Sequence, residues 1–555
     1  MERTANDGEI LQRPTDADLR NLAEALAAKA PEAIAISLLF CFANAQNENL
    51  VARALGTLGA PLSISHQILP EFREYERTST VVVNAYLQPV MQKYLESLGA
   101  RVQTVRGRGK ASIFVMQSSG GITALNAAVR EPVRTVLSGP AGGVVGAAAM
   151  AKRSGYDRII SFDMGGTSTD VALVEREAAA SSQSEIAGLP VGVPMLDVHT
   201  VGAGGGSIAR FDAAGALRVG PESAGANPGP ICYGRGTQPT VTDANLILGR
   251  LQPDRFLGGE FRLDSERACQ LTAEWLKQQR RKLSLEQFAV GVVSVVNATM
   301  EKAIRVVSVE RGYDPRDFAL VAFGGAGGLH ACELAEALNI PWVVVPTLPG
   351  ALSAFGILVS DVVKDYSRTV LWRALDKLPF RRLDQEFALL RRKAQKDFRS
   401  EGWHGKMQGR CSIDVRFQGQ GYELNVPYTR SLGLAFRREH ERRYGYSYPS
   451  REIELVTLRL RSTVPSAQSG RARRGNTANA RFEEVEPGDR MPGKKPVWLG
   501  GKKVTAAIHD RNSLPPGWKF TGPAIITEYS ATTVVPAGKR FWLDQSRNLL
   551  VQIHR

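Results

Sequence analysis

Hydrophobic and polar positions near the start of the chain follow two different spacings. Apolar residues recur every three or four positions within Asp16–Lys29 and Asn47–Leu58, which predicts two amphipathic helices. Ala33–Cys41 is instead a short apolar run, the pattern of a buried strand, and we predict a second strand at Leu62–Gln67. Because strands and helices alternate along this part of the chain, we predict an α/β fold.

The pattern changes at Ile160–Glu175, which predicts a strand, a tight turn and a second strand. Gly165 and Gly166 in the turn permit backbone angles that are closed to other residues and allow a ligand to approach closely. Successive backbone N–H groups in such a turn form a concavity that suits phosphate. Three hydroxyl donors stand beside these N–H groups: Thr167, Ser168 and Thr169.

Two carboxylates, Asp163 and Asp170, bracket this turn. A carboxylate repels phosphate, so the expected role of one or both is to hold Mg²⁺ or its waters, or to orient a nucleophile. An ordinary hairpin with polar turn residues is the competing interpretation, because short motifs also arise by chance. The glycine-rich turns that follow along the chain favour the functional interpretation.

Two further glycine-rich turns follow. Asp197–Arg210 contains Gly204 and Gly205 together with His199, a candidate acid, base or metal ligand, although an isolated histidine more often has a structural role. Strand Phe318–Phe323 then enters a glycine turn and a helix, which is a nucleotide-binding geometry. The glycines of this third turn are Gly324, Gly325, Gly327 and Gly328. Their spacing is not that of a dinucleotide site, and the chain has no P-loop motif.

The segments around these turns also have recognisable patterns. Pro221–Asp243 is a long loop rich in Gly and Pro, which in a compact domain is usually functional, and Asp243 is its expected polar anchor. Helical spacing in Asp264–Arg281 and Ser284–Arg311 predicts a helical insertion. Further on, a basic helix, a hairpin and several strands are expected up to Gln552.

Composition narrows the class of protein. A chain of 555 residues with 43% hydrophobic residues is long enough for several globular domains. No apolar run is long enough to span a membrane, and the N-terminus lacks the apolar core of a signal peptide. Five scattered cysteines without a Cys-x-x-Cys pair favour the cytoplasm. The net charge of +15 would suit a protein that binds nucleic acid, but the basic clusters lack interleaved aromatic residues. We therefore expect the chain to bind neither nucleic acid nor a membrane.

One charged stretch has two open interpretations. Glu71, Arg73, Glu74, Glu76 and Arg77 precede a predicted helix. They are either ion pairs around a capped helix or part of a loop that faces a substrate or another domain. Composition alone does not separate these two interpretations.

Eight stretches of the chain, taken together, resemble the hydantoinase A/5-oxoprolinase family, which shares the actin/sugar-kinase/Hsp70-like ATPase fold. They are Leu69–Thr80, Ser138–Gly143, Phe162–Asp170, His199–Ala209, Ala226–Pro230 with Cys232–Gly236, Pro239–Asn245, Phe323–Ala331 and Gly522–Ile526. The resemblance implies ATP-dependent ring opening of a cyclic amide such as a hydantoin or 5-oxoproline. In that reaction ATP phosphorylates the amide oxygen, and water attacks the activated carbon.

The resemblance also implies roles for the residues of the three turns. Asp163 and Asp170 would hold Mg²⁺ or water, and His199 stays a candidate catalytic residue. The phosphates of ATP would contact Gly165, Gly166, Thr167 and Thr169, with Ser168, Gly204 and Gly205 as further cofactor-binding candidates. The adenosine would be bordered by Gly324, Gly325, Gly327 and Gly328.

Family members usually act with a hydantoinase B-type subunit, so the expected assembly is a hetero-oligomer with a separate partner. Related subunits serve acetone and acetophenone carboxylases, and a carboxylase subunit is therefore an alternative function. A non-catalytic scaffold that binds a partner is another.

The chain departs from the family pattern at its start. Family members place a strand and a first phosphate loop before the region that corresponds to Ala33, so we expect an N-terminally truncated first half. Each charge-assisted hydrogen bond from that loop to phosphate would be worth roughly 1.5–3 kcal/mol. The expected domains are a remnant of the first ATPase-like half at 1–105, the second half at 106–365 with a helical insertion at about 250–311, an α+β domain at 366–465, a linker at 466–495 and a β-rich tail at 496–555.

Overall fold

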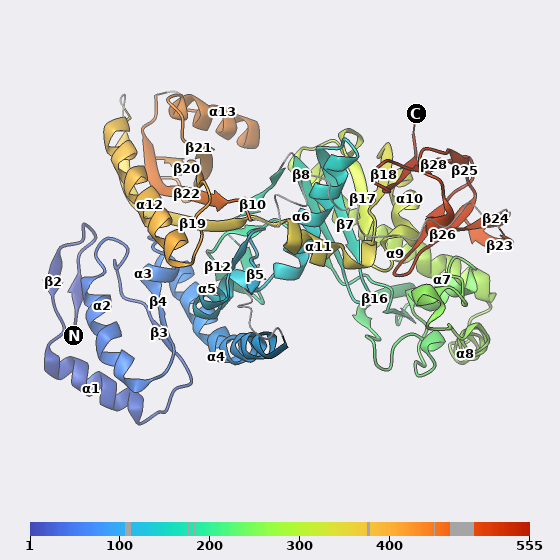
Figure 1. Ribbon diagram of the computed structural model, residues 1–555, viewed down its shortest axis with the longest axis horizontal. Coiled ribbons are helices and arrows are strands. Elements are labelled where there is room, and N and C mark those ends of the chain that lie inside the picture. The colour runs from blue at the N-terminus through green and yellow to red at the C-terminus, as the bar shows by residue number, and fades with distance from the viewer. Residues whose placement is uncertain are drawn as a thin grey trace. The chain divides into compact units, whose positions relative to one another are not determined.

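The computed structural model describes residues 1–105, 113–175, 177–181, 184–374, 378–448, 450–466 and 493–554 (Figure 1). The chain forms two compact units. Within the described ranges, the first unit takes residues 1–138, 180–195 and 360–466, and the second takes 139–179, 196–359 and 493–554. The expected linker lies almost entirely outside the described residues. No helix in the described ranges is long and apolar enough to cross a membrane.

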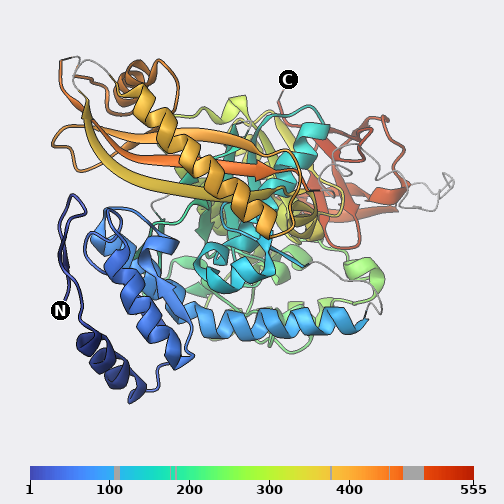
Figure 2. The same ribbon diagram turned by 60° about the vertical axis from the view of Figure 1, so that its left-hand side comes forward.

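The largest sheet of the first unit has six strands in the order β21-β20-β22-β19-β6-β5. β19 (Val362–Ala374) and β20 (Gln408–Phe417) both pair antiparallel with β22 (Ile453–Val464). Helix α12 (Phe380–Ser400) lies across these strands and buries one apolar face against them (Figure 2). The remaining elements of this layer are β21 (Leu424–Pro427), β5 (Phe114–Met116), β6 (Ile122–Ala124), α5 (Leu125–Arg130) and α13 (Leu432–Tyr444).

The N-terminal part of the first unit is a small parallel β pair with helices. β3 (Ile34–Ile36) lies beside β4 (Leu62–Ile64), and α2 (Gln46–Leu55) connects them. The long helix α4 (Glu74–Val105) follows. Short elements complete the unit: β1 (Arg3–Thr4), β2 (Ile10–Gln12), α1 (Asp16–Ala27), α3 (Ser65–Ile68), β10 (Ala180–Ser181), β11 (Ser184–Ile186) and β12 (Leu189–Val191), with β13 (Met195–Leu196) at the boundary of the two units.

A nine-stranded sheet in the second unit carries the predicted phosphate turn. Eight strands follow the order β14-β8-β7-β17-β18-β29-β28-β25, and β9 (Glu177–Ala178) pairs with β8. β7 (Arg158–Met164) and β8 (Thr169–Glu175) form an antiparallel hairpin, and β17 (Ala319–Phe323) lies parallel beside β7. β17 is apolar at every position because both of its faces are buried.

The C-terminal residues complete this sheet. β29 (Leu549–Gln552) pairs antiparallel with β18 (Trp342–Val345) on one side and with β28 (Arg540–Leu543) on the other. β25 (Phe520–Thr521) closes the edge. A separate four-stranded sheet consists of β23 (Gly493–Leu499), β24 (Lys502–Asp510), β26 (Ala524–Thr527) and β27 (Thr532–Val535).

Helices cover the large sheet of the second unit and share one hydrophobic core with it. α9 (Leu285–Val307) begins with a capping box at Ser284 and buries an apolar stripe beside β8 and β14 (His199–Val201). The other elements of this unit are α6 (Ser138–Arg153), β15 (Ser207–Phe211), β16 (Leu217–Ser223), α7 (Val241–Ile247), α8 (Ser265–Gln278), α10 (Gly327–Ala337) and α11 (Leu352–Val359).

Two strands are shorter than predicted. The segment from Ala33 is extended only as β3, and the segment from Leu62 turns into helix α3 after Ile64. The cause is the buried carboxylate of Glu48 on α2, which accepts the backbone N–H groups of Leu38 at 3.1 Å and His66 at 3.0 Å. Because these N–H groups bond to a side chain, they are not available to a sheet ladder.

Candidate functional site

The first and second glycine turns are in direct contact. The N–H of Gly205 donates to the carbonyl of Gly165 at 3.0 Å. The N–H of Gly206 repeats this contact with Gly166 at 2.7 Å. A Cβ atom at Gly204 would lie 2.7 Å from the backbone of the first turn, closer than real Cβ atoms come. Glycine at position 204 is therefore needed for the two turns to touch.

The third glycine turn reaches the same place. Gly324 has a φ of +75°, and a Cβ atom there would lie 2.4 Å from an Asp163 carboxylate oxygen. The N–H of Ala326 donates to the carbonyl of Met164 at 3.0 Å, which joins this turn to the end of β7. Gly325 is more open, with its nearest contact at 3.6 Å. The structure thus brings together the three turns that the sequence singled out.

The first turn presents free backbone donors. Gly166 and Thr167 are exposed, and Ser168 is half-buried. Within the described part of the chain, the N–H groups of these three residues donate to no acceptor. Three successive N–H groups without an internal partner fit the oxygens of an anion such as phosphate. Their role in binding phosphate stays a prediction.

Asp163 and Asp170 are directly opposite each other in the β7–β8 hairpin. Burial, together with the charge of Asp170, raises the pKa of Asp163 from 3.8 to about 6. Burial also raises the pKa of Asp170, although a hydrogen bond from the Thr200 hydroxyl at 2.5 Å opposes this rise. Among the described residues, no Lys or Arg side chain pairs with either carboxylate.

Two adjacent carboxylates without a positive partner are a donor set that fits Mg²⁺. This ion takes oxygen ligands, keeps several waters and is commonly held by one or two carboxylates together with substrate phosphates. The described residues contain no group of three or more His, Cys, Asp or Glu side chains placed to hold a metal. The pair would therefore supply two protein ligands and leave the other positions to water and phosphate.

Strand pairing brings His199 near this pair, but its side chain faces away from it. In the β14–β8 register, Thr200 is opposite Asp170, and His199 is opposite Val171. Because successive side chains of a strand point to opposite faces, His199 lies on the other face of the sheet from Asp170. Its proposed role as an acid, base or metal ligand stays a prediction.

The Thr169 hydroxyl is engaged within the protein. Thr169 is fully buried, and its hydroxyl donates to the carbonyl of Ala203 at 2.5 Å. This bond ties β8 to the second glycine turn. A phosphate contact by Thr169, predicted from its position in the motif, would have to compete with this bond.

Sequence reasoning missed the residue that anchors the second glycine turn. Both the N–H and the hydroxyl of Thr242 donate to the carbonyl of Gly205, at 2.7 and 2.8 Å. Thr242 lies in Pro239–Asn245, a stretch that carries part of the family resemblance but had no role of its own. Its position directly before Asp243, the predicted anchor, is the one signal in the sequence that points to it.

Asp243 anchors the long Gly- and Pro-rich loop, as predicted. It is fully buried, and its carboxylate accepts the N–H groups of Ile231 at 3.1 Å, Cys232 at 2.8 Å and Thr240 at 3.0 Å. Thr240 and Asp243 also form a capping box at the start of α7. One carboxylate thus holds two parts of the loop together.

A buried polar cluster behind the third glycine turn was also missed. His330, in the first turns of α10, lies 2.7 Å from Asn297, and Glu333 accepts from Asn297 and Arg250, both at 2.7 Å. Burial and the charge of Arg250 lower the pKa of His330 to about 3. His330 is therefore neutral at physiological pH and positions α10 through hydrogen bonds.

The charged stretch forms ion pairs inside the first unit, and Glu74, Glu76 and Arg77 belong to the start of α4 rather than preceding it. The Arg77 side chain is fully buried and bonds to Glu74 and to the carbonyl of Glu71. Arg73 pairs with Glu423 at 2.8 Å. These contacts support the ion-pair interpretation of the stretch.

Two protein-family descriptions match this chain. Hydantoinase/oxoprolinase matches residues 77–366, and the hydantoinase/oxoprolinase C-terminal domain matches residues 465–553. Caprolactamase subunit alpha from Pseudomonas jessenii is 36% identical over 93% of this chain and 75% of its own length. An uncharacterized protein of Methanocaldococcus jannaschii is 35% identical over 98% of this chain and 80% of its own length. The 5-oxoprolinase of Saccharomyces cerevisiae is 29% identical over 96% of this chain but only 42% of its own length.

Solved structures agree with the sequence matches. The ATP-dependent caprolactamase from Pseudomonas jessenii has a TM-score of 0.86 at 32% identity, over 100% of this chain and 82% of that one. Nucleotide-free acetone carboxylase has a TM-score of 0.75 at 26% identity, over 100% of this chain and 81% of that one. The predicted α/β fold of the actin-like ATPase type is confirmed. The chain belongs to the hydantoinase/oxoprolinase family.

Proposed function

We propose that this chain is the A-type subunit of an enzyme that uses ATP to open a cyclic amide. The observation that carries the proposal is the meeting of three glycine turns beside a carboxylate pair without a positive partner among the described residues. Free N–H groups suit the phosphates of a nucleotide, and the paired carboxylates suit its cation. The names of the relatives support the substrate class, because caprolactamase and 5-oxoprolinase are both named for cyclic amides.

In this proposal the first and third turns bind ATP, and the second turn supports the first. The N–H groups of Gly166, Thr167 and Ser168 bind phosphate oxygens, and Asp163 and Asp170 hold Mg²⁺ directly or through water. Bound ATP supplies the phosphoryl group that activates the amide oxygen. Thr242 and Thr169 keep the first two turns in contact while phosphate binds. The adenosine would lie beside the third turn at Gly324 and Gly325, whereas Gly327 and Gly328 are buried at the start of α10.

The proposed partner is a hydantoinase B-type subunit. The support is the name of the 36% identical relative, which is the alpha subunit of a caprolactamase and so implies a second kind of subunit in that enzyme. The five cysteines are free thiols in the structure, which favours a reducing compartment such as the cytoplasm.

A carboxylase subunit is the second candidate. Its support is the TM-score of 0.75 to acetone carboxylase over the whole of this chain. In that case the same nucleotide site would serve the activation of a ketone or bicarbonate. The two candidates require different substrates: a cyclic amide for the first, and bicarbonate with a ketone for the second. The test therefore compares these two sets of substrates.

The test is an assay of this chain with its B-type partner, Mg²⁺, ATP and a panel of lactams and hydantoins. Phosphate release and the ring-opened product are measured together. We expect turnover that needs both ATP and a cyclic amide, and that falls at least about a hundredfold in Asp163→Asn. Asp157→Asn is the matched control, because Asp157 is exposed just before the other end of β7.

Two outcomes would contradict the proposal. Turnover that requires bicarbonate and a ketone would assign the chain to the carboxylases. A stable complex that hydrolyses no ATP with any cyclic amide or ketone would make it a scaffold.

A further inference from the structure

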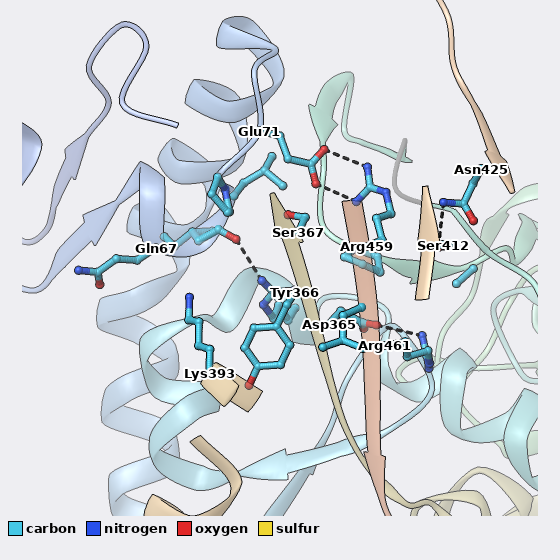
Figure 3. A pocket seen from close by; sticks show the side chains of 17 residues that line it. Gln67, Glu71, Asp365, Tyr366, Ser367, Lys393, Ser412, Asn425, Arg459 and Arg461 are labelled. Atoms are coloured by element: carbon cyan, nitrogen blue, oxygen red, sulfur yellow. Dashed lines mark hydrogen bonds and ion pairs between the residues drawn. The ribbon is translucent and has the colours of Figure 1, made fainter. Parts of the chain in front are cut away.

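The first unit contains a pocket of about 220 Å³, whereas the glycine turns belong to the second unit. Its walls come from residues 67–71, from β19 and β22, and from helix α12 (Figure 3). A single water needs roughly 10–15 Å³ of such space, so the pocket can hold a small organic molecule.

Some charged groups of the wall are already neutralised by the protein. Arg459 forms a two-point ion pair with Glu71 at 2.8 and 3.0 Å, and its Nε donates to Asp414 at 2.7 Å. Arg134 pairs with Glu131 at 2.5 Å. These guanidinium groups build a rigid charged wall but have no charge left to attract a ligand.

Two other charged groups of the pocket have spare capacity. Lys393 on α12 is exposed, lies over the ring of Tyr366, and has no carboxylate partner in the described part of the chain. Asp365 is paired with Arg461 at 3.6 Å, too far for a hydrogen bond, while Arg461 donates to the carbonyl of Ser119 at 2.6 Å. The pocket thus offers one free ammonium group and one loosely held carboxylate.

Neutral polar groups accompany these charges. The Gln67 amide and the Ser367 hydroxyl both line the pocket, and neither has a hydrogen-bond partner among the described residues. A polar side chain without a partner in a pocket wall is suited to hold a ligand.

Lys393 and Asp365 approach the pocket from different sides of β19. Asp365 and Ser367 alternate with Tyr366 along this strand, so they point to the opposite face from the tyrosine. Lys393 lies beside Tyr366 and extends toward the segment of Gln67, whereas Asp365 lies with Arg461 (Figure 3). A ligand that meets both charges must therefore carry its own charges several atoms apart.

We propose that this pocket binds a small ω-amino acid as a zwitterion, with its carboxylate toward Lys393 and its ammonium group toward Asp365. A zwitterion matches one free ammonium group and one loosely paired carboxylate without adding net charge to a wall that is already balanced. An α-amino acid carries both charged groups on a single carbon atom and would reach only one of the two side chains. Opening a lactam ring produces an ω-amino acid. The idea that the ligand is the enzyme's product therefore rests on the proposed function, whereas the match of charges does not.

The test is titration calorimetry of the full chain without ATP. The ligands are glycine, 4-aminobutanoate and 6-aminohexanoate, with propanoate and butylamine as probes for each charge alone. We expect one of the two ω-amino acids to bind with a dissociation constant below about 1 mM, and glycine and the single-charge probes to bind at least about tenfold more weakly. Lys393→Met and Asp365→Asn should each weaken that binding at least about tenfold.

The matched control is Lys396→Met, which removes an exposed lysine from the same helix outside the pocket and should leave binding unchanged. No binding up to about 10 mM would overturn the proposal, as would equal binding of propanoate. Binding that survives both Lys393→Met and Asp365→Asn would place the ligand elsewhere and also overturn it. The titration contains no ATP and is therefore independent of the turnover assay. If the ω-amino acid binds but the turnover assay shows no activity, only the proposed function is refuted.

Discussion

Replacing Asp163 by asparagine should make the protein more stable at neutral pH in the absence of Mg²⁺. The pKa of this carboxyl group is raised from 3.8 to about 6 by burial and by the charge of Asp170. A rise of about two pKa units corresponds to about 3 kcal/mol, because each unit is worth about 1.4 kcal/mol. Since water partly reaches the half-buried group, this figure is an upper bound.

The sign follows from proton binding. The folded protein holds the Asp163 proton more tightly than the unfolded chain, so the free energy of unfolding falls as the pH rises from 3.8 to about 6. The destabilisation is complete above pH 6 and disappears below 3.8. Asparagine carries no charge to desolvate, so the advantage of the variant should be largest at pH 8 and about half as large at pH 5.

Thermal unfolding by calorimetry at pH 5 and pH 8 measures this effect. For a unit of this size, each kcal/mol shifts the transition by about 2–4 °C, so we expect a gain of several degrees at pH 8. Asp157→Asn, which changes an exposed carboxylate, should leave the transition in place. Mg²⁺ with ATP should stabilise the wild-type protein and not Asp163→Asn. Two results would refute the reasoning: an Asp163→Asn variant that is no more stable than the wild type at pH 8, or one whose gain in stability is the same at pH 5 and pH 8.

Three further predictions concern the contacts that hold the turns. Gly204→Ala should weaken ATP binding at least about tenfold in calorimetry, because the added Cβ would push the two turns apart, whereas Gly139→Ala meets no atom within 4 Å and should bind normally. Thr242→Val should lower the free energy of unfolding by about 1 kcal/mol in urea titrations, and Thr242→Ser should restore it; equal losses in both variants would show that the hydroxyl is unimportant. Asp243→Ala should cost about 3 kcal/mol or more, because three backbone N–H groups are left without their acceptor, and an unchanged urea midpoint would contradict that role.

The local parts of the site were predictable from the sequence. The hairpin around Gly165 and Gly166 follows from apolar strands that flank a glycine turn, and these signals all lie within Ile160–Glu175. Asp243 was predicted as the polar anchor of its Gly- and Pro-rich loop, and its carboxylate does hold that loop. Helical spacing located α9 within a few residues of its ends.

The parts that could not be predicted depend on contacts between distant segments. Thr242 holds Gly205 across nearly forty positions of the chain, and no local pattern indicates which carbonyl a threonine will reach. The early end of β3 depends on Glu48, a carboxylate on the following helix that looks like an ordinary surface residue in the sequence. His199 and Asp170 point to opposite faces of the sheet because of the register in which β14 pairs with β8. That register is set by the pairing of the two strands and cannot be seen in the sequence.

The place of β29 in the large sheet has a consequence for how the protein is made. This strand lies between β18 and β28, yet it is synthesised some two hundred residues after β18. Until β29 leaves the ribosome, the apolar strand β18 (Trp342–Val345) keeps an unpaired edge. Such an edge invites pairing with other chains. We therefore expect ribosome-bound chains that stop short of Leu549 to depend on chaperones, and their released forms to aggregate in a sedimentation assay.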